Sequence, residues 1–425
     1  MRTMRLCSIG VLLGFVTASP LWAACPGRSV PESTMAAAPP AVVDALRLSS
    51  EVPALEARPT LVDQLRETPH NYFRFVNGPF TEAVCVLFDG VRGGLPDVNL
   101  HGDAHIEQYA VTSLGRGLVD FDDSARGPYV IDLVRFGVSL ELAARQKGWR
   151  GSPAFDAFLR GYRDALANPS LERPPYRTID RLRSRFEFDH GLALRRADAL
   201  MGSEPVAAAD LERDLQGYVA EMRAEDPATP AGFFRVKRAG RLKMGIGSAL
   251  DEKYLVRIEG WTAEERDDQI LELKGVHALP DGGCVHTDLG PQRVPLGMSL
   301  IAYASFPFSG ILAREDRFFW VHGWTDDYVE LSIESSLSEP GDLGEVAYDV
   351  GVQLGRAHPK GVAGRTSPRG LRNVLLASVR TNEDRIRRAI DELTEATVAA
   401  WTAFRGGPPE PGPRGALRAD RRETR

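Results

Sequence analysis

Leu100-His101-Gly102-Asp103-Ala104-His105-Ile106-Glu107-Gln108 is the stretch that decides the fold, together with the acidic run Leu118-Val119-Asp120-Phe121-Asp122-Asp123 that follows it. The intervening residues 109–117 have the pattern of a short strand, a turn punctuated by glycine and a returning strand. We expect this hairpin to fold the two acidic runs back on each other.

The predicted hairpin places Asp103 on the loop that enters one strand and Asp120 at the exit of the other. Their carboxylates would then face a common point. Carboxylates at strand ends, beside histidine and glycine, suit a hard divalent cation and a phosphorylated ligand, because Mg²⁺ prefers oxygen ligands. The local pattern therefore predicts a site for a metal ion and a phosphate.

The composition is that of an ordinary globular protein. The chain has 425 residues, of which 43% are hydrophobic and 26% charged, so it is long enough for two domains or one bilobal domain. Its formal net charge of −6 argues against a nucleic-acid partner and against an anionic membrane surface.

The N-terminus has the layout of a secretory signal peptide, which we predict over residues 1–23. Two arginines precede the apolar run Leu6–Val16, and small residues follow it. The mature protein is then periplasmic or secreted. Two alternatives remain open: Cys25 could accept a lipid and anchor the protein to a membrane, or the apolar N-terminus could stay uncleaved. Residues 24–41 are predicted to form a linker.

The cysteines of the mature chain are too few for a disulfide framework. Cys85 and Cys284 could pair in an oxidising compartment, or both could remain free and buried as small apolar side chains. The sequence contains no CxxC pair and no Cys/His spacing of the kind that binds zinc.

Apolar periodicity divides the remainder of the chain into segments. Residues 42–228 are predicted to form a helical lobe that carries the acidic loops, and 229–325 a small antiparallel-sheet lobe. Residues 326–404 are predicted to be helices that return to the helical lobe, and 405–425 a disordered tail. The strands are expected at 233–237, 253–258, 269–274 and 318–321, the main helices from 131 and over 343–358 and 371–404, and helix or strand at 80–87.

Two features of the sheet segment suit phosphate binding. Glycines at 245 and 247, followed by Ser248, lie between two expected strands and would let backbone N–H groups approach a phosphate. Lys274 ends a strand and could contact a phosphate. The ordinary alternatives are a glycine-containing hairpin without a ligand and an exposed strand lysine.

The order of these motifs resembles a known group of enzymes. His101-Gly102-Asp103-Ala104-His105, then the Asp120 run and Ile131-Asp132-Leu133, looks like the catalytic half of aminoglycoside-phosphotransferase-type kinases. From about Phe73 to His358 the chain more closely resembles an uncharacterised bacterial family with a kinase-like fold. The resemblance implies an α+β, bilobal, protein-kinase-like fold in permuted order, because the acidic loops precede the glycine hairpin.

The resemblance also implies roles for individual residues. Asp103 would be the base for an acceptor hydroxyl, with His101 and His105 beside it, and Asp132 would support this loop. The predicted Mg²⁺ ligands are Asp120, Asp122 and Gln108, and the predicted nucleotide-binding residues are Lys274, Gly245, Gly247 and Ser248. The expected cofactors are Mg²⁺ and ATP, and the expected partner is an unknown small-molecule or protein acceptor. Alternatively, these residues cap turns and satisfy buried backbone groups.

Three departures favour a second function. Gln108 stands where the kinase pattern has asparagine, and no acid occurs between Leu289 and Arg314, the segment expected to form the helix that pairs with the lysine. Glu330 or Glu334 could replace that acid. An exported protein also meets little ATP. The alternative is therefore an inactive or weakly active pseudokinase that binds a ligand or an envelope protein, and a metal-dependent hydrolase is a more distant third.

Overall fold

The computed structural model describes residues 40–48, 55, 57–172, 174–243, 246, 251–279, 283–286, 289–360 and 367–406. These residues belong to one compact unit of the chain, 37–425. The predicted signal peptide, Cys25, Gly245, Gly247 and Ser248 lie outside the described residues, as do nearly all of the predicted linker and tail. The division of the compact unit into lobes stays a prediction.

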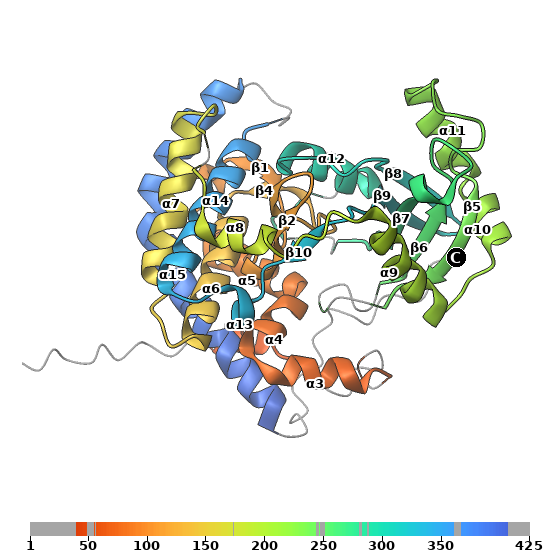
Figure 1. The fold of residues 1–425 in the computed structure, drawn as a ribbon. Coiled ribbons are helices and arrows are strands. Elements are labelled where there is room, and N and C mark those ends of the chain that lie inside the picture. Colours follow the sequence, from red (N-terminus) through yellow and green to blue (C-terminus); the bar gives the residue numbers. More distant parts are fainter. Residues whose placement is uncertain are drawn as a thin grey trace, which may run out of the picture. The chain divides into compact units, whose positions relative to one another are not determined.

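The structure is a mixture of helices and antiparallel sheets, as predicted for an α+β protein (Figure 1). The helices before the sheet segment are α1 Pro40–Ala45, α3 Pro59–Glu67, α4 Pro69–Phe75, α5 Asn77–Phe88, α6 Val130–Gln146, α7 Ser152–Ala167, α8 Arg177–Arg183, α9 His190–Ser203, α10 Ala208–Asp214 and α11 Gln216–Glu225. The later helices are α12 Arg293–Ile301, α13 Ile333–Ser336, α14 Pro340–Ala357 and α15 Pro368–Gly406. Short 3₁₀ turns cover 89–94, 106–108, 265–267 and 290–292.

Within the described residues, the strands form three antiparallel sheets. They are β1 Asp97–Leu100, β2 Tyr109–Thr112, β3 Arg116–Leu118, β4 Ala125–Pro128, β5 Val236–Arg241, β6 Lys253–Ile258, β7 Gln269–Gly275, β8 Gly310–Arg314, β9 Arg317–Gly323 and β10 Tyr328–Glu330. The strand orders are β1-β4, β10-β2-β3 and β5-β6-β7-β9-β8. The predicted hairpin is confirmed, because β2 pairs with β3 and the acidic run begins directly after β3.

Helices α6, α7, α14 and α15 pack around the main hydrophobic core (Figure 1). Helices α7 and α14 approach closely because both carry glycine at the crossing. A Cβ on Gly161 of α7 would lie 2.2 Å from the Tyr348 carbonyl oxygen, and one on Gly351 of α14 would lie 2.1 Å from that of Phe158. This contact fixes the end of α14, which carries His358, against the core below the acidic loops.

The five-stranded sheet has a smaller core of its own, to which α10 and α11 contribute. The expected strand at 233–237 begins later, at Val236, because Phe233 and Phe234 instead pack as an aromatic turn with ring centroids 4.7 Å apart. The ambiguous segment 80–87 is helical and lies in α5. Tertiary burial of Phe80, Val84 and Phe88 on one face decides in favour of the helix.

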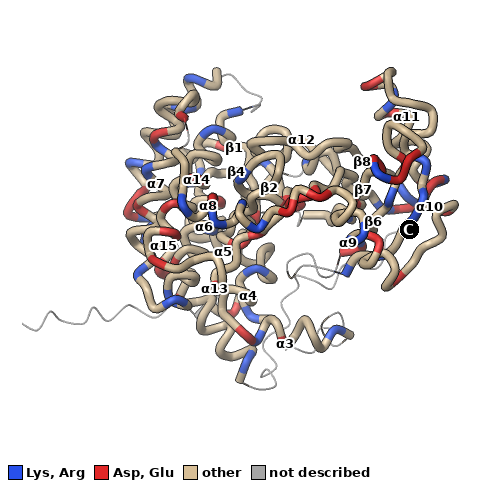
Figure 2. Tube along the Cα trace, in the orientation of Figure 1, with Lys and Arg blue, Asp and Glu red and all other residues tan. Residues whose placement is uncertain are grey.

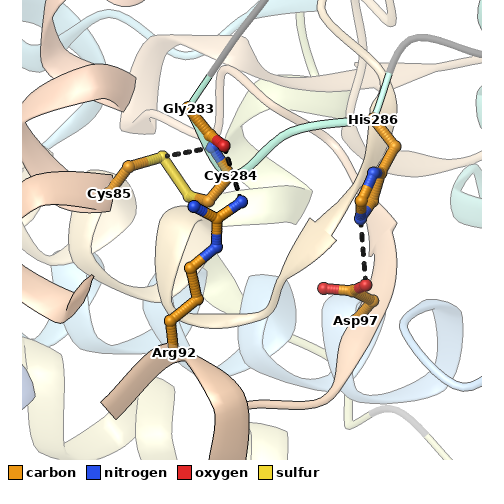
Figure 3. Close-up of a disulfide and its surroundings, with 6 residues drawn as sticks. All are labelled: Cys85, Arg92, Asp97, Gly283, Cys284 and His286. Carbon is orange, nitrogen blue, oxygen red and sulfur yellow. Dashed lines mark hydrogen bonds and ion pairs between the residues drawn. A yellow bond between two sulfur atoms is a disulfide. The ribbon is translucent and has the colours of Figure 1, made fainter. Parts of the chain in front are cut away.

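Cys85 of α5 forms a disulfide with Cys284, which lies 199 residues later in the chain (Figure 3). The same junction is fixed by Arg92, which donates a hydrogen bond to the Gly283 carbonyl at 2.6 Å, and by the His286–Asp97 contact at 3.1 Å. These contacts hold the segment that follows β7 against the helices.

Charges of both signs alternate along α7 and α15, as expected for solvated helix faces (Figure 2). Ion pairs join these two helices, including Arg163–Glu383 and Arg387–Asp156, the latter at 2.7 Å. No helix within the described part of the chain is both long and apolar enough to span a bilayer.

Candidate functional site

Contacts with Asp123 and Asp132 hold the loop between β1 and β2 in one conformation. Gly102 has φ +82°, and a Cβ on it would lie 2.0 Å from the Asp123 carbonyl oxygen, so this position requires glycine both for its backbone and for space. The Asp132 carboxylate, in the first turn of α6, accepts hydrogen bonds from the His101 N–H at 2.7 Å and from the Gly102 N–H at 2.9 Å. The loop that carries Asp103 is therefore fixed at two backbone groups.

Asp132 is in turn oriented by a buried chain of polar groups. Its Oδ2 lies 3.1 Å from His358 Nε2, and His358 Nδ1 lies 2.8 Å from the Tyr162 hydroxyl. Burial disfavours the Asp132 carboxylate, but His358 and the loop N–H groups outweigh burial and lower its pKa. Asp132 therefore contacts the loop that carries Asp103, and its role in a catalytic site stays a prediction.

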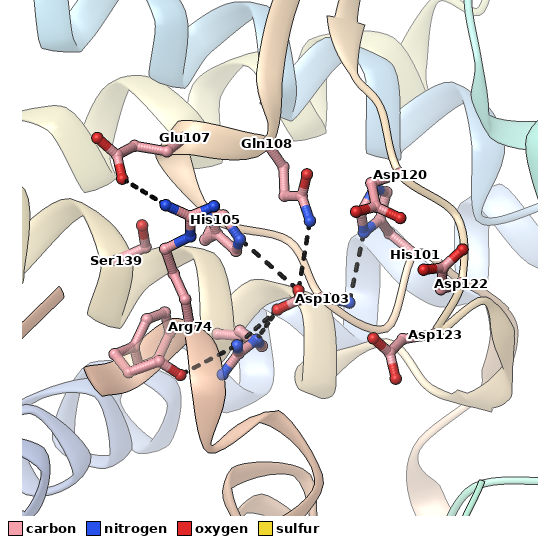
Figure 4. A network of polar contacts seen from close by, with 12 residues as sticks. Arg74, His101, Asp103, His105, Glu107, Gln108, Asp120, Asp122, Asp123 and Ser139 are labelled. Carbon is pink, nitrogen blue, oxygen red and sulfur yellow. Dashed lines mark hydrogen bonds and ion pairs between the residues drawn. The ribbon is translucent and has the colours of Figure 1, made fainter. Parts of the chain in front are cut away.

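Asp103 is the acid at the centre of this loop, and both of its carboxylate oxygens are engaged (Figure 4). Oδ1 accepts from the Arg135 guanidinium at 2.6 Å, and Oδ2 accepts from the Gln108 amide at 3.4 Å and lies 3.6 Å from His105 Nε2. Burial raises the pKa of Asp103 more than the charge of Arg135 lowers it. The carboxyl therefore binds a proton more readily than a solvated aspartate.

The two histidines of the motif lie behind Asp103, inside the protein. The His101 ring lies between the Val119 carbonyl, at 3.2 Å, and the Asp103 N–H, at 3.3 Å. Burial, followed by the nearby Arg74 charge, holds the pKa of His105 well below its usual range. Both rings are buried. Both rings contact Asp103, and they support the loop and orient the Asp103 carboxylate.

The second acidic run meets a lysine from the five-stranded sheet. Asp120 has φ +65°, a left-handed conformation that aspartate tolerates, and it turns the chain at the end of β3. Lys274 Nζ lies 2.5 Å from Asp120 Oδ1 and also pairs with the Asp122 carboxylate. Lys274 is only 5% exposed, so it is not the exposed strand lysine of the ordinary alternative. Figure 4 shows Asp120, Asp122 and Asp123 together on one side of Asp103.

The two carboxyl groups that contact Lys274 have pKa values shifted in opposite directions. Burial and the neighbouring Asp120 charge raise the pKa of Asp122 to about 8. Burial acts in the same direction on Asp120, but the charges of Lys274 and Lys253 overcome it and lower the pKa of Asp120. Asp120 is thus the permanent anion, and its side chain retains 28% exposure.

Sequence reasoning missed three cationic side chains at this centre. Lys253 lies directly opposite Lys274 in the β6–β7 register and is buried. His277 contacts Asp123 at 3.1 Å, and Asp123 is the leading reason that its pKa rises to about 10 against the opposing effect of burial. Arg293, the first residue of α12, donates to the carbonyl oxygens of Asp122, Ser124 (3.2 Å) and His277 (2.7 Å). Only the strand register, and not the local pattern, could have revealed Lys253.

The prediction that Glu330 or Glu334 pairs with Lys274 is wrong. Glu330 accepts a hydrogen bond from the Tyr328 hydroxyl at 2.9 Å, and Glu334 accepts one from Gln146 at 2.7 Å. Lys274 instead pairs with the aspartates and is influenced by Glu272, two residues earlier on the same strand face. The segment noted for its lack of an acid forms α12, which carries Arg293 at its start.

The donor set near Lys274 is compatible with Mg²⁺. The Asp120 and Asp122 carboxylates meet at Lys274, and the Gln108 amide lies beside Asp103; Mg²⁺ commonly uses one or two carboxylates together with water and substrate phosphates. Over the described residues, no cluster of three or more His, Cys, Asp or Glu side chains is arranged to hold a metal by itself.

The comparison with protein families identifies part of this region. Residues 56–186 match a family described as "Uncharacterized protein conserved in bacteria (DUF2252)". The match covers the loops that carry Asp103 and Asp120 and the first turn of α6 with Asp132, and it confirms the resemblance to an uncharacterised bacterial family there. No curated protein and no solved structure matches the chain significantly.

Proposed function

We propose that this protein is an exported, kinase-like phosphotransferase that moves a phosphoryl group from a nucleotide to an unidentified hydroxyl. The observation that carries the proposal is the meeting of Lys274, from the five-stranded sheet, with Asp120 and Asp122, which follow the β2–β3 hairpin. Phosphoryl transfer depends mainly on positioning and charge stabilisation, so it requires cations and carboxylates gathered from separate elements.

The arrangement of the sheet supports a kinase-like interpretation. Protein kinases place their phosphate-contacting lysine on the third strand of a small sheet. Lys274 lies on β7, the third strand of the five-stranded sheet in chain order, and α12 follows between β7 and β8. The acidic loops come before this sheet in the chain, so the proposed kinase order is permuted.

The proposed roles follow from the contacts. Asp103, held by Asp132 and Arg135, would accept the proton of the acceptor hydroxyl. Lys274 would contact the phosphates of the nucleotide. Asp120 and Asp122, with the Gln108 oxygen, are the residues that would hold Mg²⁺, which when bound neutralises phosphate charge.

A specific observation favours the second candidate, a pseudokinase that binds a ligand or a partner without turnover. Both oxygens of Asp103 are occupied, one by Arg135 and the other by Gln108. In addition, the segment that forms α12 contains no acid that could draw Lys274 away from the aspartates. A lysine kept on the aspartates leaves less positive charge for a nucleotide phosphate.

Export is part of the proposal. The N-terminal pattern of two arginines, an apolar run and small residues supports a signal peptide. The Cys85–Cys284 disulfide supports an oxidising compartment such as the periplasm, because cytosolic thiols are kept reduced.

The test combines nucleotide binding with phosphoryl transfer. Binding of ATP with and without Mg²⁺ is measured by calorimetry for the wild type, Asp120→Asn and Lys274→Met, with Lys147→Met as a control on the far end of α6. Transfer from radiolabelled ATP is measured in parallel for the wild type and Asp103→Asn. We expect Mg²⁺-dependent binding that Asp120→Asn and Lys274→Met weaken and Lys147→Met leaves unchanged.

The outcomes separate the two candidates. Transfer that disappears in Asp103→Asn supports the enzyme. Binding without any transfer that depends on Asp103 supports the pseudokinase. If neither ATP nor Mg²⁺ binds the wild type, both nucleotide-dependent interpretations are wrong.

A further inference from the structure

A cavity of about 420 Å³ lies where the end of α12, the end of α14 and the start of α15 meet. Its size is in the range that holds a small metabolite. Asp103, Asp120 and Lys274 do not line it, so it is distinct from the candidate site. Its lining includes Ile301, Tyr303, Gln353, Arg356, Lys360 and Arg372.

The cavity carries an excess of positive charge. Arg356, Lys360 and Arg372 line it, and its described lining includes no aspartate or glutamate. No hydrogen bond or ion pair joins Arg372 to another described residue. The Nε of Arg356 is buried and has no hydrogen-bond partner within the described structure. Two guanidinium groups with unused donors therefore border one space.

Holding these cations together is unfavourable without an anion. Burial lowers the pKa of Lys360, and the charge of Arg356 lowers it further. Lys360 donates one hydrogen bond, to the Leu300 carbonyl at 3.1 Å, and an ammonium group has further donors to offer. An anion in the cavity would relieve the repulsion and satisfy the free donors.

The remaining lining residues indicate what kind of anion fits. Gln353 is already committed, because it accepts from the Leu118 N–H at 2.7 Å and donates to the carbonyl oxygens of Leu118 and Ile301. The anion would therefore be recognised by Arg356, Lys360 and Arg372. A guanidinium group can donate two parallel hydrogen bonds to two oxygens of a phosphate. Three cations also balance the charge of a dianion better than that of a single carboxylate. Ile301 and neighbouring prolines provide an apolar wall for a carbon skeleton.

We propose that this cavity binds a small phosphate-bearing molecule, held by Arg356, Lys360 and Arg372. The proposal is independent of the phosphotransferase proposal, because it uses none of the same side chains. A second cavity, of about 440 Å³, shares Arg356, but Glu172 lines it as well as Arg116, and Arg116 is already paired with Asp349.

The test measures binding of inorganic phosphate and pyrophosphate to the full-length protein by calorimetry, at constant ionic strength set with chloride. Arg372→Gln removes one lining cation that has no partner among the described residues, so the variant should fold normally. Arg369→Gln is the matched control, because Arg369 is exposed on the same helix and does not line the cavity. Lys274→Met removes the lysine of the candidate site.

We expect Arg372→Gln to weaken binding about tenfold, as for the loss of one charge-assisted contact. Arg369→Gln should bind like the wild type, and Lys274→Met should retain the binding that Arg372→Gln weakens. The proposal is overturned if the wild type binds neither anion at millimolar concentration or if Arg372→Gln and Arg369→Gln bind equally well. It is also overturned if Lys274→Met abolishes binding, because the anion would then occupy the candidate site.

Discussion

Asp132→Asn tests whether Asp132 holds the loop that carries Asp103, as the structure indicates. Asp132 accepts three hydrogen bonds, from the N–H groups of His101 (2.7 Å) and Gly102 (2.9 Å) and from His358 Nε2 (3.1 Å). Asparagine keeps the shape but replaces one oxygen with an NH₂ group, which faces a donor. At least one charge-assisted bond is lost, and one buried donor is left unsatisfied.

The cost can be worked from these losses. A hydrogen bond to a charged group contributes about 1.5–3 kcal/mol, and an unsatisfied buried donor costs a further amount of about 1–3 kcal/mol. We expect Asp132→Asn to lower the free energy of unfolding by about 2.5–6 kcal/mol. Asp156→Asn is the control, because Asp156 is half exposed and pairs with Arg387 at the surface, so its loss should cost at most about 1 kcal/mol.

Urea unfolding followed by circular dichroism, with the disulfide intact, measures both variants against the wild type. Native-state hydrogen exchange should also show faster exchange at the His101 and Gly102 amides in Asp132→Asn. If the two variants lose the same free energy, or if these two amides keep their protection, the inference that Asp132 holds the loop is wrong.

Three further perturbations test other parts of the argument. Gly102→Ala should cost several kcal/mol more than Gly148→Ala, because both glycines have positive φ but only a Cβ at Gly102 meets backbone, and equal melting temperatures would contradict this. His70 and Arg74 lower the pKa of Glu107 to about 2 despite burial, so Glu107 stabilises the fold above pH 4.5, its usual pKa. Glu107→Gln should be less stable than the wild type at pH 7, by up to about 3 kcal/mol, and the gap should close between pH 4.5 and about 2; a gap that does not change with pH would refute this. Replacing both disulfide cysteines by serine should cost about 2–5 kcal/mol, as expected for opening so long a loop, and a reducing agent should lower the stability of the wild type but not of the variant.

Local patterns predicted the elements whose identity depends on neighbouring residues. The β2–β3 hairpin, the α6 helix and the strands at 253–258 and 269–274 were predicted close to their observed bounds, because periodicity and turn residues act over short distances. The strand expected from Phe233 was misplaced, since a cluster of aromatic rings from the sheet core overrides the local alternation.

The candidate site was only partly predictable. The motif indicated Asp103, Asp120, Asp132 and Lys274, and the structure brings Lys274 to Asp120 and Asp132 to the loop of Asp103. Arg135 and Arg293 escaped notice because each acts on residues distant in sequence, and a single arginine in a helix has no local signature. The sequence could not decide whether Cys85 and Cys284 pair, because they are 199 residues apart and their proximity depends on the fold of the intervening chain.

The balance of charge at the centre explains why enzyme and binder remain close alternatives. Lys274 pairs with the Asp120 anion and also contacts Asp122, and Lys253 lies opposite it on the neighbouring strand. Under the proposed function, a nucleotide phosphate would have to compete with these aspartates for the lysine, unless a divalent cation bound the aspartates at the same time. The same side chains would therefore favour binding of metal and nucleotide together over either alone. Whether turnover follows depends on Asp103, whose oxygens must leave Arg135 or Gln108 far enough to receive a proton.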